Sequence, residues 1–188
     1  GKLKNVIAAG NTYEISEDFR NISIKIDTAD VVFALSDNET CRVECYEEEK
    51  AKHSVTVQDG TLTIQLIDER TVEDYIPYIG INIGSPKITV YLPEGQYASL
   101  SVRGSTGDID VPEAMQFGDV DISFSTGDVS FFASAAASVK IKTGTGSIRM
   151  EHASAGALDL SVSTGHITVS DVTCEGNVQV SVSTGKVS

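Results

Sequence analysis

The stretch SFSTGDVS, residues 123–130, carries a Ser-Thr-Gly-Asp step that recurs through the second half of the chain. Close copies are VRGSTGDID at 102–110 and SVSTGHITV at 161–169. The Thr-Gly pairs are Thr106-Gly107, Thr126-Gly127, Thr145-Gly146, Thr164-Gly165 and Thr184-Gly185. Their intervals are 20, 19, 19 and 20 residues. A constant period near 20 residues is typical of a solenoid, in which each repeat forms one coil that packs against its neighbours.

Apolar and polar residues alternate on both sides of each Thr-Gly pair, with the period of two that indicates β-strands. In the coil around Thr126, the apolar positions are Val120 and Ile122 upstream, and Val129 and Phe131 downstream. Before each pair, the apolar residues lie at even distances from the threonine, which is itself counted as inward. After the pair they lie at odd distances from it. The chain must therefore bend there, and glycine permits the bend because a positive φ costs it little.

These patterns predict an all-β fold, a right-handed parallel β-solenoid with about 19–20 residues per coil. Stacked coils would place equivalent residues about 4.8 Å apart, so the five threonines would form one internal file. Residues 100–188 would form the regular coils. Residues 1–99 would form a more irregular β-rich portion, continuous with the solenoid and containing an antiparallel hairpin.

Three segments of the first hundred residues carry their own predictions. Residues 21–35 align with the repeat as a diverged first coil, with Thr28 and Ala29 in place of the Thr-Gly pair. Residues 53–67 alternate on both sides of an Asp-Gly step, which predicts a hairpin. The acidic run 47–50 is interpreted as a solvated loop.

The segment 73–86 is more apolar than an ordinary exposed loop. It is either a flap or cap that protects edge backbone of the solenoid, or an exposed patch for a partner or for self-association. The residues of this possible partner surface are Tyr75, Ile76, Tyr78, Ile79 and Ile81.

The negative charge of the chain limits the classes of partner that it is expected to bind. Twenty-seven acidic residues against 14 basic ones give a formal net charge of −13. Such a surface repels phosphate backbones and anionic lipid headgroups, so nucleic-acid binding is not expected. No apolar run approaches the roughly 18 residues that a membrane-spanning helix needs.

The three cysteines do not predict a disulfide framework. Cys41 and Cys45 are four residues apart in a predicted strand, about 13 Å at roughly 3.3 Å per residue, which is too far for a disulfide. Cys41 and Cys45 are expected to be buried thiols on the same strand face as Val43. Cys174 is the odd third cysteine, with no partner for a disulfide. No Cys or His pair has the spacing of a metal site.

No catalytic motif appears: the chain lacks a G-x-S-x-G elbow, a P-loop and a dinucleotide-binding fingerprint. We therefore predict neither an enzyme nor a cofactor. Asp108, Asp110 and Asp128 would lie on adjacent coils as surface acids or as a weak calcium site. Pectate lyases use such acidic clusters on solenoids, so a polysaccharide-acting β-helix enzyme remains a remote alternative.

The run PKITVYLPEGQYASLSVRGSTGDIDV, residues 86–111, followed by further STGD-type corners, resembles the bacterial "putative adhesin" family of β-strand-repeat proteins, a domain of unknown function. The resemblance extends from about residue 20 to the end of the chain. It implies a cell-surface or extracellular protein, often anchored to the membrane, and in some relatives encoded beside envelope-stress genes. The family has no established catalytic or binding residues.

The leading hypothesis is a non-catalytic, adhesin-like interaction module that binds an unidentified protein or glycan of the envelope or of a host surface. The alternative is a structural or regulatory scaffold of the envelope stress response. Because the sequence begins at Gly1 rather than Met, any export or anchor segment would lie upstream, and membrane anchoring is what the family resemblance implies. Because Ser188 falls halfway through a coil, we expect either further coils or an end-to-end or edge contact in an oligomer.

Overall fold

The computed structural model describes residues 8–71 and 86–188, and these residues form β-strands and connecting turns without a helix. The strands are β1 (Ala8–Ile15), β2 (Asn21–Lys25), β3 (Asp30–Leu35), β4 (Cys41–Glu48), β5 (Ala51–Gln58), β6 (Thr61–Asp68), β7 (Lys87–Leu92), β8 (Gln96–Thr106), β9 (Ile109–Val111), β10 (Gln116–Thr126), β11 (Val129–Phe131), β12 (Ser134–Cys174) and β13 (Val178–Val187).

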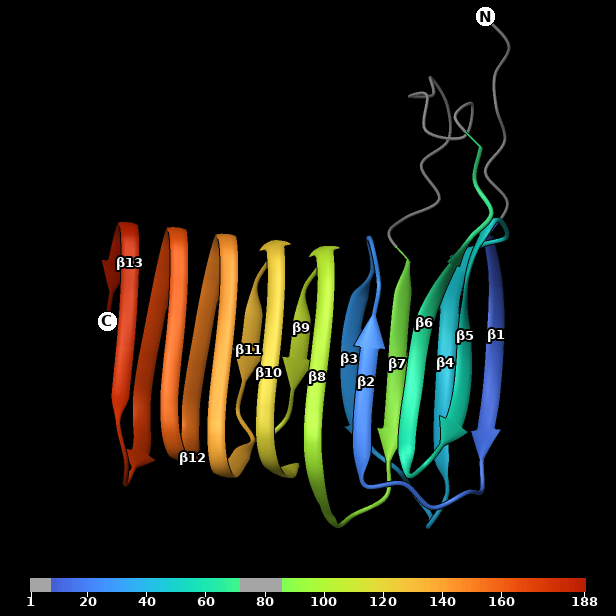
Figure 1. Cartoon of the computed structure of the whole chain (residues 1–188), viewed down its shortest axis with the longest axis horizontal. Coiled ribbons are helices and arrows are strands. Elements are labelled where there is room, and N and C mark those ends of the chain that lie inside the picture. The colour runs from blue at the N-terminus through green and yellow to red at the C-terminus, as the bar shows by residue number, and fades with distance from the viewer. Residues whose placement is uncertain (1–7, 72–85) are drawn as a thin grey trace, which may run out of the picture.

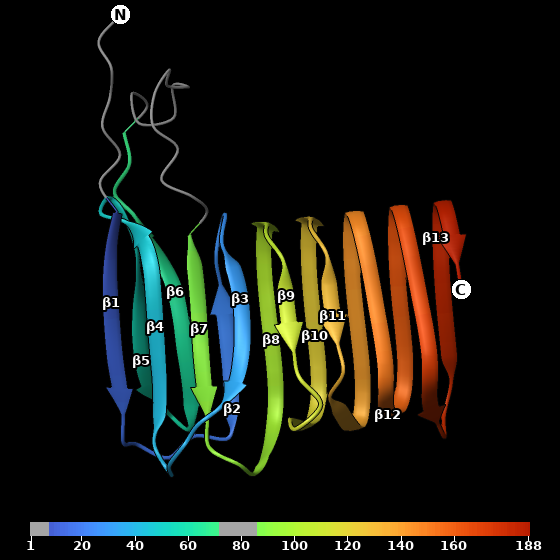
Figure 2. The same cartoon turned by 180° about the vertical axis from the view of Figure 1, so that it is seen from behind.

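All of these strands belong to one sheet that folds back on itself. One layer follows the order β1-β4-β7-β3-β9-β11, the path then passes through the long β12, and the other layer follows β10-β8-β2-β6-β5. Figures 1 and 2 show the two layers from opposite sides, with β1 and β5 at the same end of the molecule. The fold is therefore all-β and resembles a β-solenoid, with the core enclosed between the layers.

The repeated coils stack in parallel register. Val120 lies opposite Leu100 in the preceding coil and opposite Val139 in the following one. The segment with Thr28 has the same register, since Ile22 pairs with Leu100 and Thr28 forms a bridge with Thr106. The Thr-Gly period thus corresponds to one winding of the chain.

The sheet is mixed, because its N-terminal end contains antiparallel pairs. β4 pairs antiparallel with β1 and β7, and β5 pairs antiparallel with β6. The β5–β6 turn has Asp59 at φ 52° and Gly60 at φ 73°. Two consecutive positive φ values are typical of the tight turn that joins antiparallel strands, whereas parallel strands need a longer crossover.

The apolar columns predicted from the alternation form the core. Val102, Ile122, Ile141 and Leu160 occupy one inward position in four coils, and each is 0% exposed. Each such side chain stabilises the fold by about 1.5–3 kcal/mol relative to an exposed one. In β13, by contrast, Val178 is 58% exposed because β13 pairs only with β12.

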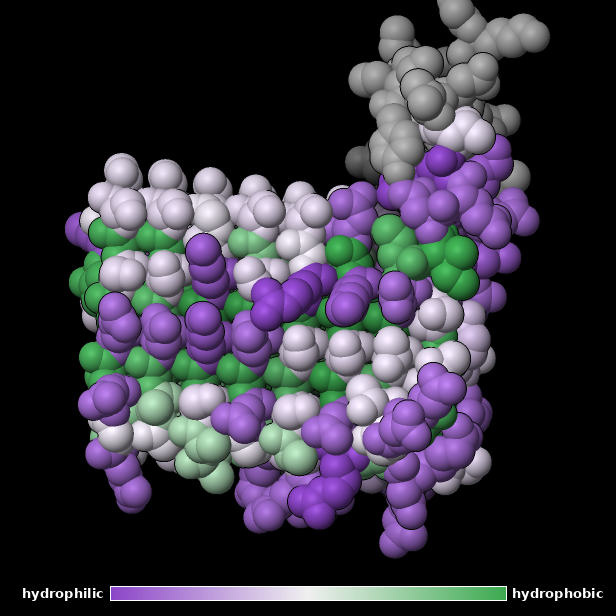
Figure 3. All heavy atoms as spheres, in the orientation of Figure 1, coloured by the Kyte–Doolittle hydropathy of each residue, from purple (hydrophilic) through white to green (hydrophobic). Residues whose placement is uncertain are grey.

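The five threonines lie in the same file, but their predicted inward orientation is wrong. Thr126 pairs in register with Thr106 and with Thr145, and all of these side chains are exposed. The chain begins its bend before the threonine, so the last inward residue of the strand lies two positions earlier, as with Phe124 and Thr143. In Figure 3 the exposed corners form the pale row along the upper edge of the coils.

The acidic run 47–50 is also not entirely a solvated loop. Glu47 lies in β4 and is only 1% exposed, whereas Glu49 is exposed at the turn that follows. The cysteine predictions are confirmed, since Cys41 and Cys45 are buried thiols on the face that carries Val43. Burial, and next the charge of a nearby glutamate, raises the pKa of both thiols to about 12.

Candidate functional site

The Thr-Gly corners are held together by close backbone contacts. Gly127 has φ 152°, and a methyl group on its Cα would overlap the carbonyl oxygen of Gly107. The same relation recurs at Gly146, Gly165 and Gly185. The glycine file therefore serves to let neighbouring coils approach each other, and it presents no side chain to a ligand.

The corner aspartates form a ladder along the same edge. The Asp30 carboxylate accepts a hydrogen bond from the Asp108 backbone N–H, and Asp108 accepts one from Asp128, both at 2.9 Å. Asp128 in turn accepts from the N–H of Ser147 at 2.9 Å and from its hydroxyl at 3.0 Å. Each carboxylate thus caps the corner of the next coil.

This arrangement bears on the calcium prediction for Asp108, Asp110 and Asp128. Asp110 lies on the outer face of β9, where partial burial and then the charge of Asp108 raise its pKa. Across residues 8–71 and 86–188, no group of three or more His, Cys, Asp or Glu side chains is arranged to hold a metal ion. Oδ1 of Asp108 and Oδ1 of Asp128 each accept a backbone N–H, and calcium binding at these residues stays a prediction.

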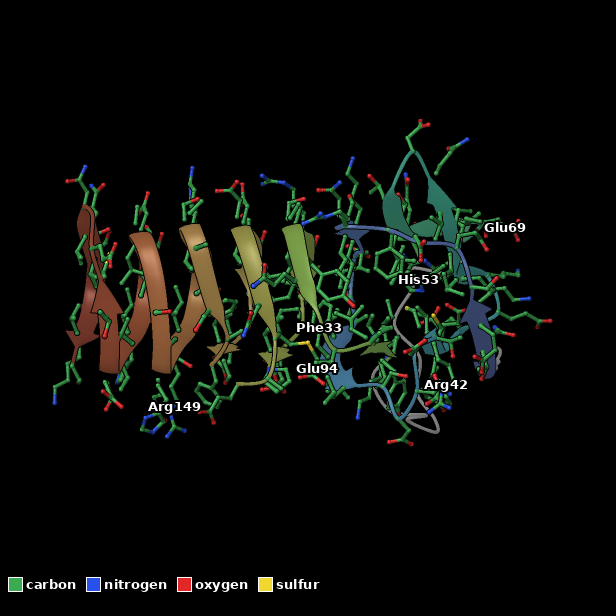
Figure 4. All side chains as sticks on the ribbon, turned by 90° about the horizontal axis from the view of Figure 1, so that it is seen from below. Phe33, Arg42, His53, Glu69, Glu94 and Arg149 are labelled. Atoms are coloured by element: carbon green, nitrogen blue, oxygen red, sulfur yellow. The ribbon has the colours of Figure 1, made fainter. Side chains whose placement is uncertain are left out.

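The predicted partner surface formed by Tyr75, Ile76, Tyr78, Ile79 and Ile81 lies outside the described residues. The candidate site that the structure does describe is a groove at the opposite edge of the coils from the Thr-Gly corners. Its lining residues follow the starts of β8, β10 and β12. These strand starts lie at the lower edge in Figure 1, which is the edge turned toward the viewer in Figure 4. We call it the start-edge groove.

The start-edge groove has a volume of about 450 Å³ and crosses several successive coils. Its lining residues are Arg20, Gln96, Tyr97, Ala98, Gln116, Phe117, Gly118, Ser134, Ala136 and Ser154. A groove of this size falls in the range of small-molecule sites, which are about 300–1,000 Å³.

The hollow exists because small residues form its centre. A methyl group on Gly118 would come too close to the carbonyl oxygen of Ala98. The register between β10 and β12 shifts here, so that Ala136 and Ala137 face the single residue Gly118. This is a β-bulge, a feature that is over-represented beside functional sites.

One wall of the groove is a row of uncharged polar side chains. Gln116 pairs in register with Gln96 on one side and with Ser134 on the other. The Gln96 amide donates to the Gln116 amide oxygen at 3.3 Å, and the Ser134 hydroxyl accepts from the Ser154 backbone N–H at 3.3 Å. These groups therefore form a regular line of donors and acceptors across the coils.

The floor of the groove is aromatic. The Tyr97 ring lies 6.1 Å from that of Phe117 and stacks at 5.9 Å on that of Phe19. Tyr97 donates its hydroxyl to the Pro93 carbonyl at 2.7 Å. Burial, and next the charge of Cys41, raises the pKa of Tyr97 to about 12, so the hydroxyl stays protonated at neutral pH.

Charges lie at one end of the groove only. Arg20 lines it at the coil of β2, where its carbonyl accepts from the Ala98 N–H at 2.7 Å. A neighbouring hollow shares Tyr97 and is lined by Glu17, Asp18 and Glu39. Between Arg20 and Ser154 the lining is neutral.

The sequence reasoning missed this groove, although a signal was present. Gln96 and Gln116 are 20 residues apart, so the coil period already places them at equivalent positions. The bulge and the small residues between the coils depend on how the strands meet, and the alternation pattern alone does not reveal them.

A second polar cluster that the sequence did not predict lies between the two layers. Glu47 Oε1 accepts a hydrogen bond from Asn11 Nδ2 at 2.9 Å. Glu47 Oε2 accepts one from the His53 backbone N–H at 2.8 Å, and His53 Nδ1 lies 2.7 Å from the same oxygen. Burial opposes the charge of Glu47, but the hydrogen bonds from His53 and Asn11 outweigh it, so its pKa is lowered. Figure 4 shows His53 inside the molecule, whereas Arg149 projects outward. We call this cluster the Glu47 clasp.

A solved structure from Clostridium sporogenes shares the architecture at low sequence identity. A "putative cell adhesion protein" from Clostridium sporogenes superposes with a TM-score of 0.54 at 9% identity, covering 96% of this chain and 100% of that one. A "putative adhesin" from Bacteroides fragilis gives a TM-score of 0.47 at 17% identity, with 100% of both chains covered. At such identities the likeness concerns the fold.

Three further findings bear on the identity of the chain. No helix in the described part of the chain is both long and apolar enough to cross a membrane. No curated protein matches the sequence. The Toastrack DUF4097 family matches residues 19–187, with the repeated coils and the start-edge groove inside that range, and the chain therefore belongs to the Toastrack DUF4097 family.

Proposed function

We propose that this chain is a non-catalytic, adhesin-like module of the cell surface that binds an envelope or host-surface ligand through the start-edge groove. The observation that carries the proposal is the line of uncharged donors and acceptors from Gln96 to Ser154, set above an aromatic floor and continued over successive coils. Binding sites commonly combine such a floor with a few convergent polar groups.

The C. sporogenes protein, which has this fold, is called a "putative cell adhesion protein", and that name is consistent with the proposal. None of the three described histidines, His53, His152 and His166, lines the groove. His53 belongs to the buried Glu47 clasp, and His152 pairs with Asp171 at 2.8 Å on exposed turns. A binding role needs neither of them.

Within this proposal the two parts of the chain have different tasks. Residues 1–99 form the β-rich portion that carries the Glu47 clasp and the Arg20 end of the groove. Residues 100–188 form the coils of a right-handed β-solenoid, a handedness that follows from the strong preference of parallel crossovers. In the full protein, an anchor would hold the module at the surface.

The proposal is tested by retention on bacterial cell-wall material and on host cells, with and without calcium. Ala136→Trp fills the groove at an exposed position, and Lys142→Trp places the same residue on the outer face of the same strand. We expect retention of the wild type and of Lys142→Trp, and loss of retention for Ala136→Trp. Absence of wild-type retention on every surface would refute the proposal.

A second candidate function is a structural or regulatory scaffold of the envelope stress response. The glycine contacts and the aspartate ladder favour it, because both stiffen the stack of coils along its axis. For a scaffold, deleting the gene would change survival under detergent or antibiotic stress while attachment stayed the same. A groove-filling variant would then behave like the wild type in both assays.

A further inference from the structure

We infer that the start-edge groove binds an extended, uncharged polysaccharide strand, which lies across the coils with successive sugar rings opposite successive windings. The inference rests on the proposed function and specifies its ligand class. Four properties of the groove lead to it: its repeat, its hydrogen-bonding groups, its charge and its floor.

The repeat of the groove suits a polymer of similar units. Gln96, Gln116 and Ser134 are register partners on consecutive strands, and such partners are about 4.8 Å apart. This spacing is close to the length of one pyranose unit along an extended chain. Each ring can therefore meet an equivalent side chain.

The hydrogen-bonding groups suit hydroxyl groups. An amide and a hydroxyl each donate and accept, as does a sugar hydroxyl, so either partner can satisfy the other. The amides of Gln96 and Gln116 are exposed, with one hydrogen bond between them at 3.3 Å, and each retains capacity for a ligand. A lipid chain would cover these amides without pairing them, which is unfavourable.

The charge of the surroundings selects an uncharged strand. The chain carries a net charge of −13, and the hollow next to the groove is lined by Glu17, Asp18 and Glu39. A carboxylated or phosphorylated polymer that continued past Arg20 would meet these carboxylates. The Arg20 guanidinium forms none of the ion pairs found among the described residues, and its five donors can reach sugar hydroxyls.

The pairing of the strands along the groove disfavours a peptide. Tyr97 and Phe117 line the groove but are only 8% and 4% exposed, so the floor offers the C–H groups of a sugar ring a narrow apolar strip. A peptide would bind in extended form by adding a strand at a sheet edge, but β8, β10 and β12 are already paired with one another along the groove. Along these three strands the groove therefore offers no free sheet edge for a peptide to pair with.

The test is calorimetric titration with linear β-1,4-linked glucose and N-acetylglucosamine oligomers of one to eight units. Oligogalacturonate serves as the charged probe, and an extended Ser/Thr-rich peptide as the peptide probe. We expect affinity for at least one neutral series to rise with length up to about four units and then level off. The Gln96→Ala/Gln116→Ala variant should bind at least tenfold more weakly, and Lys142→Ala should bind as the wild type does.

Circular dichroism confirms that each variant is folded, and Ala136→Trp provides a second, steric block that leaves the amides in place. Binding of no neutral oligomer, affinity independent of length, or tighter binding of oligogalacturonate or of the peptide would overturn the inference. If Ala136→Trp still abolishes surface retention in that case, the ligand class is wrong while the proposed function stands. If the wild type is not retained on any surface, the proposed function itself fails.

Discussion

Gly127 shows why the repeat keeps its Thr-Gly pair. Two demands coincide there: a φ of 152°, and a neighbouring carbonyl oxygen in the place that a Cβ would occupy. Ala29, at the same position of the first coil, is not among the residues with positive φ, which explains why alanine is accepted there. Glycine is thus required by the contact between coils as well as by the local bend.

We expect Gly127→Ala to lower the free energy of unfolding by about 2–5 kcal/mol, because it adds left-handed strain and a backbone overlap. Gly60→Ala is the matched control, since Gly60 also has a positive φ, 73°, but has open space around it. Its cost should be about 1–2 kcal/mol, from backbone strain alone. Urea denaturation measures both values, and equal losses would contradict the role of the contact between coils.

The Glu47 clasp acts at the level of the strands. β1 and β5 are the two ends of the sheet path, and each pairs with a single strand. Asn11 from β1 and His53 from β5 both bind Glu47 of β4, so the carboxylate links the two ends across the core. A buried carboxylate without these partners would be costly, which makes the clasp sensitive to substitution.

We expect Glu47→Gln to destabilise the protein by about 2–4 kcal/mol at pH 7, because the charged hydrogen bonds are lost. The lowered pKa of Glu47 contributes stability above the unfolded value of about 4.3, and this contribution is lost as the pH falls through the lower folded value. The difference between wild type and variant should therefore shrink below about pH 4.

Thermal unfolding from pH 3 to pH 7 measures this difference, and Glu49→Gln at the exposed turn is the control. The control should stay within about 0.5 kcal/mol of the wild type. A gap between wild type and Glu47→Gln that stayed constant over the whole range would show that the ionisation of Glu47 does not contribute.

The molecule as a whole is a stack in which each coil contacts chiefly its neighbours. Val129 and Ile148 are register partners, so residues 129–147 make up one complete winding. In such an architecture stability is approximately a sum over repeats and their interfaces, and a complete repeat can be removed without changing the register of the rest.

We expect the chain lacking residues 129–147 to fold cooperatively and to be shorter by about 4.8 Å along its axis. A chain lacking only residues 129–138 should not fold, because Asp128 would then run into a segment that belongs to the opposite layer. Circular dichroism and small-angle X-ray scattering test both chains. Folding of the half-winding deletion, or unfolding of the full-winding deletion, would contradict the stacked arrangement.

Much of this architecture can be read from local pattern. The period of the Thr-Gly pairs, the alternation of residues such as Ile122 and Val129, and the hairpin at Asp59 all correspond to features of the structure. The physical reason is repetition. Each coil meets nearly the same neighbours, so one inward column per strand is enough to define both the coil and its register.

Other features depend on how separate segments meet in space. Thr126 points outward because the bend begins before it. Glu47 is buried because residues of β1 and β5 both contact it. The groove is hollow because Gly118 faces two alanines. Residues distant in the chain create each of these environments. A period of two along a single strand carries no information about them, and so the placement of the candidate site came from the packing of the coils.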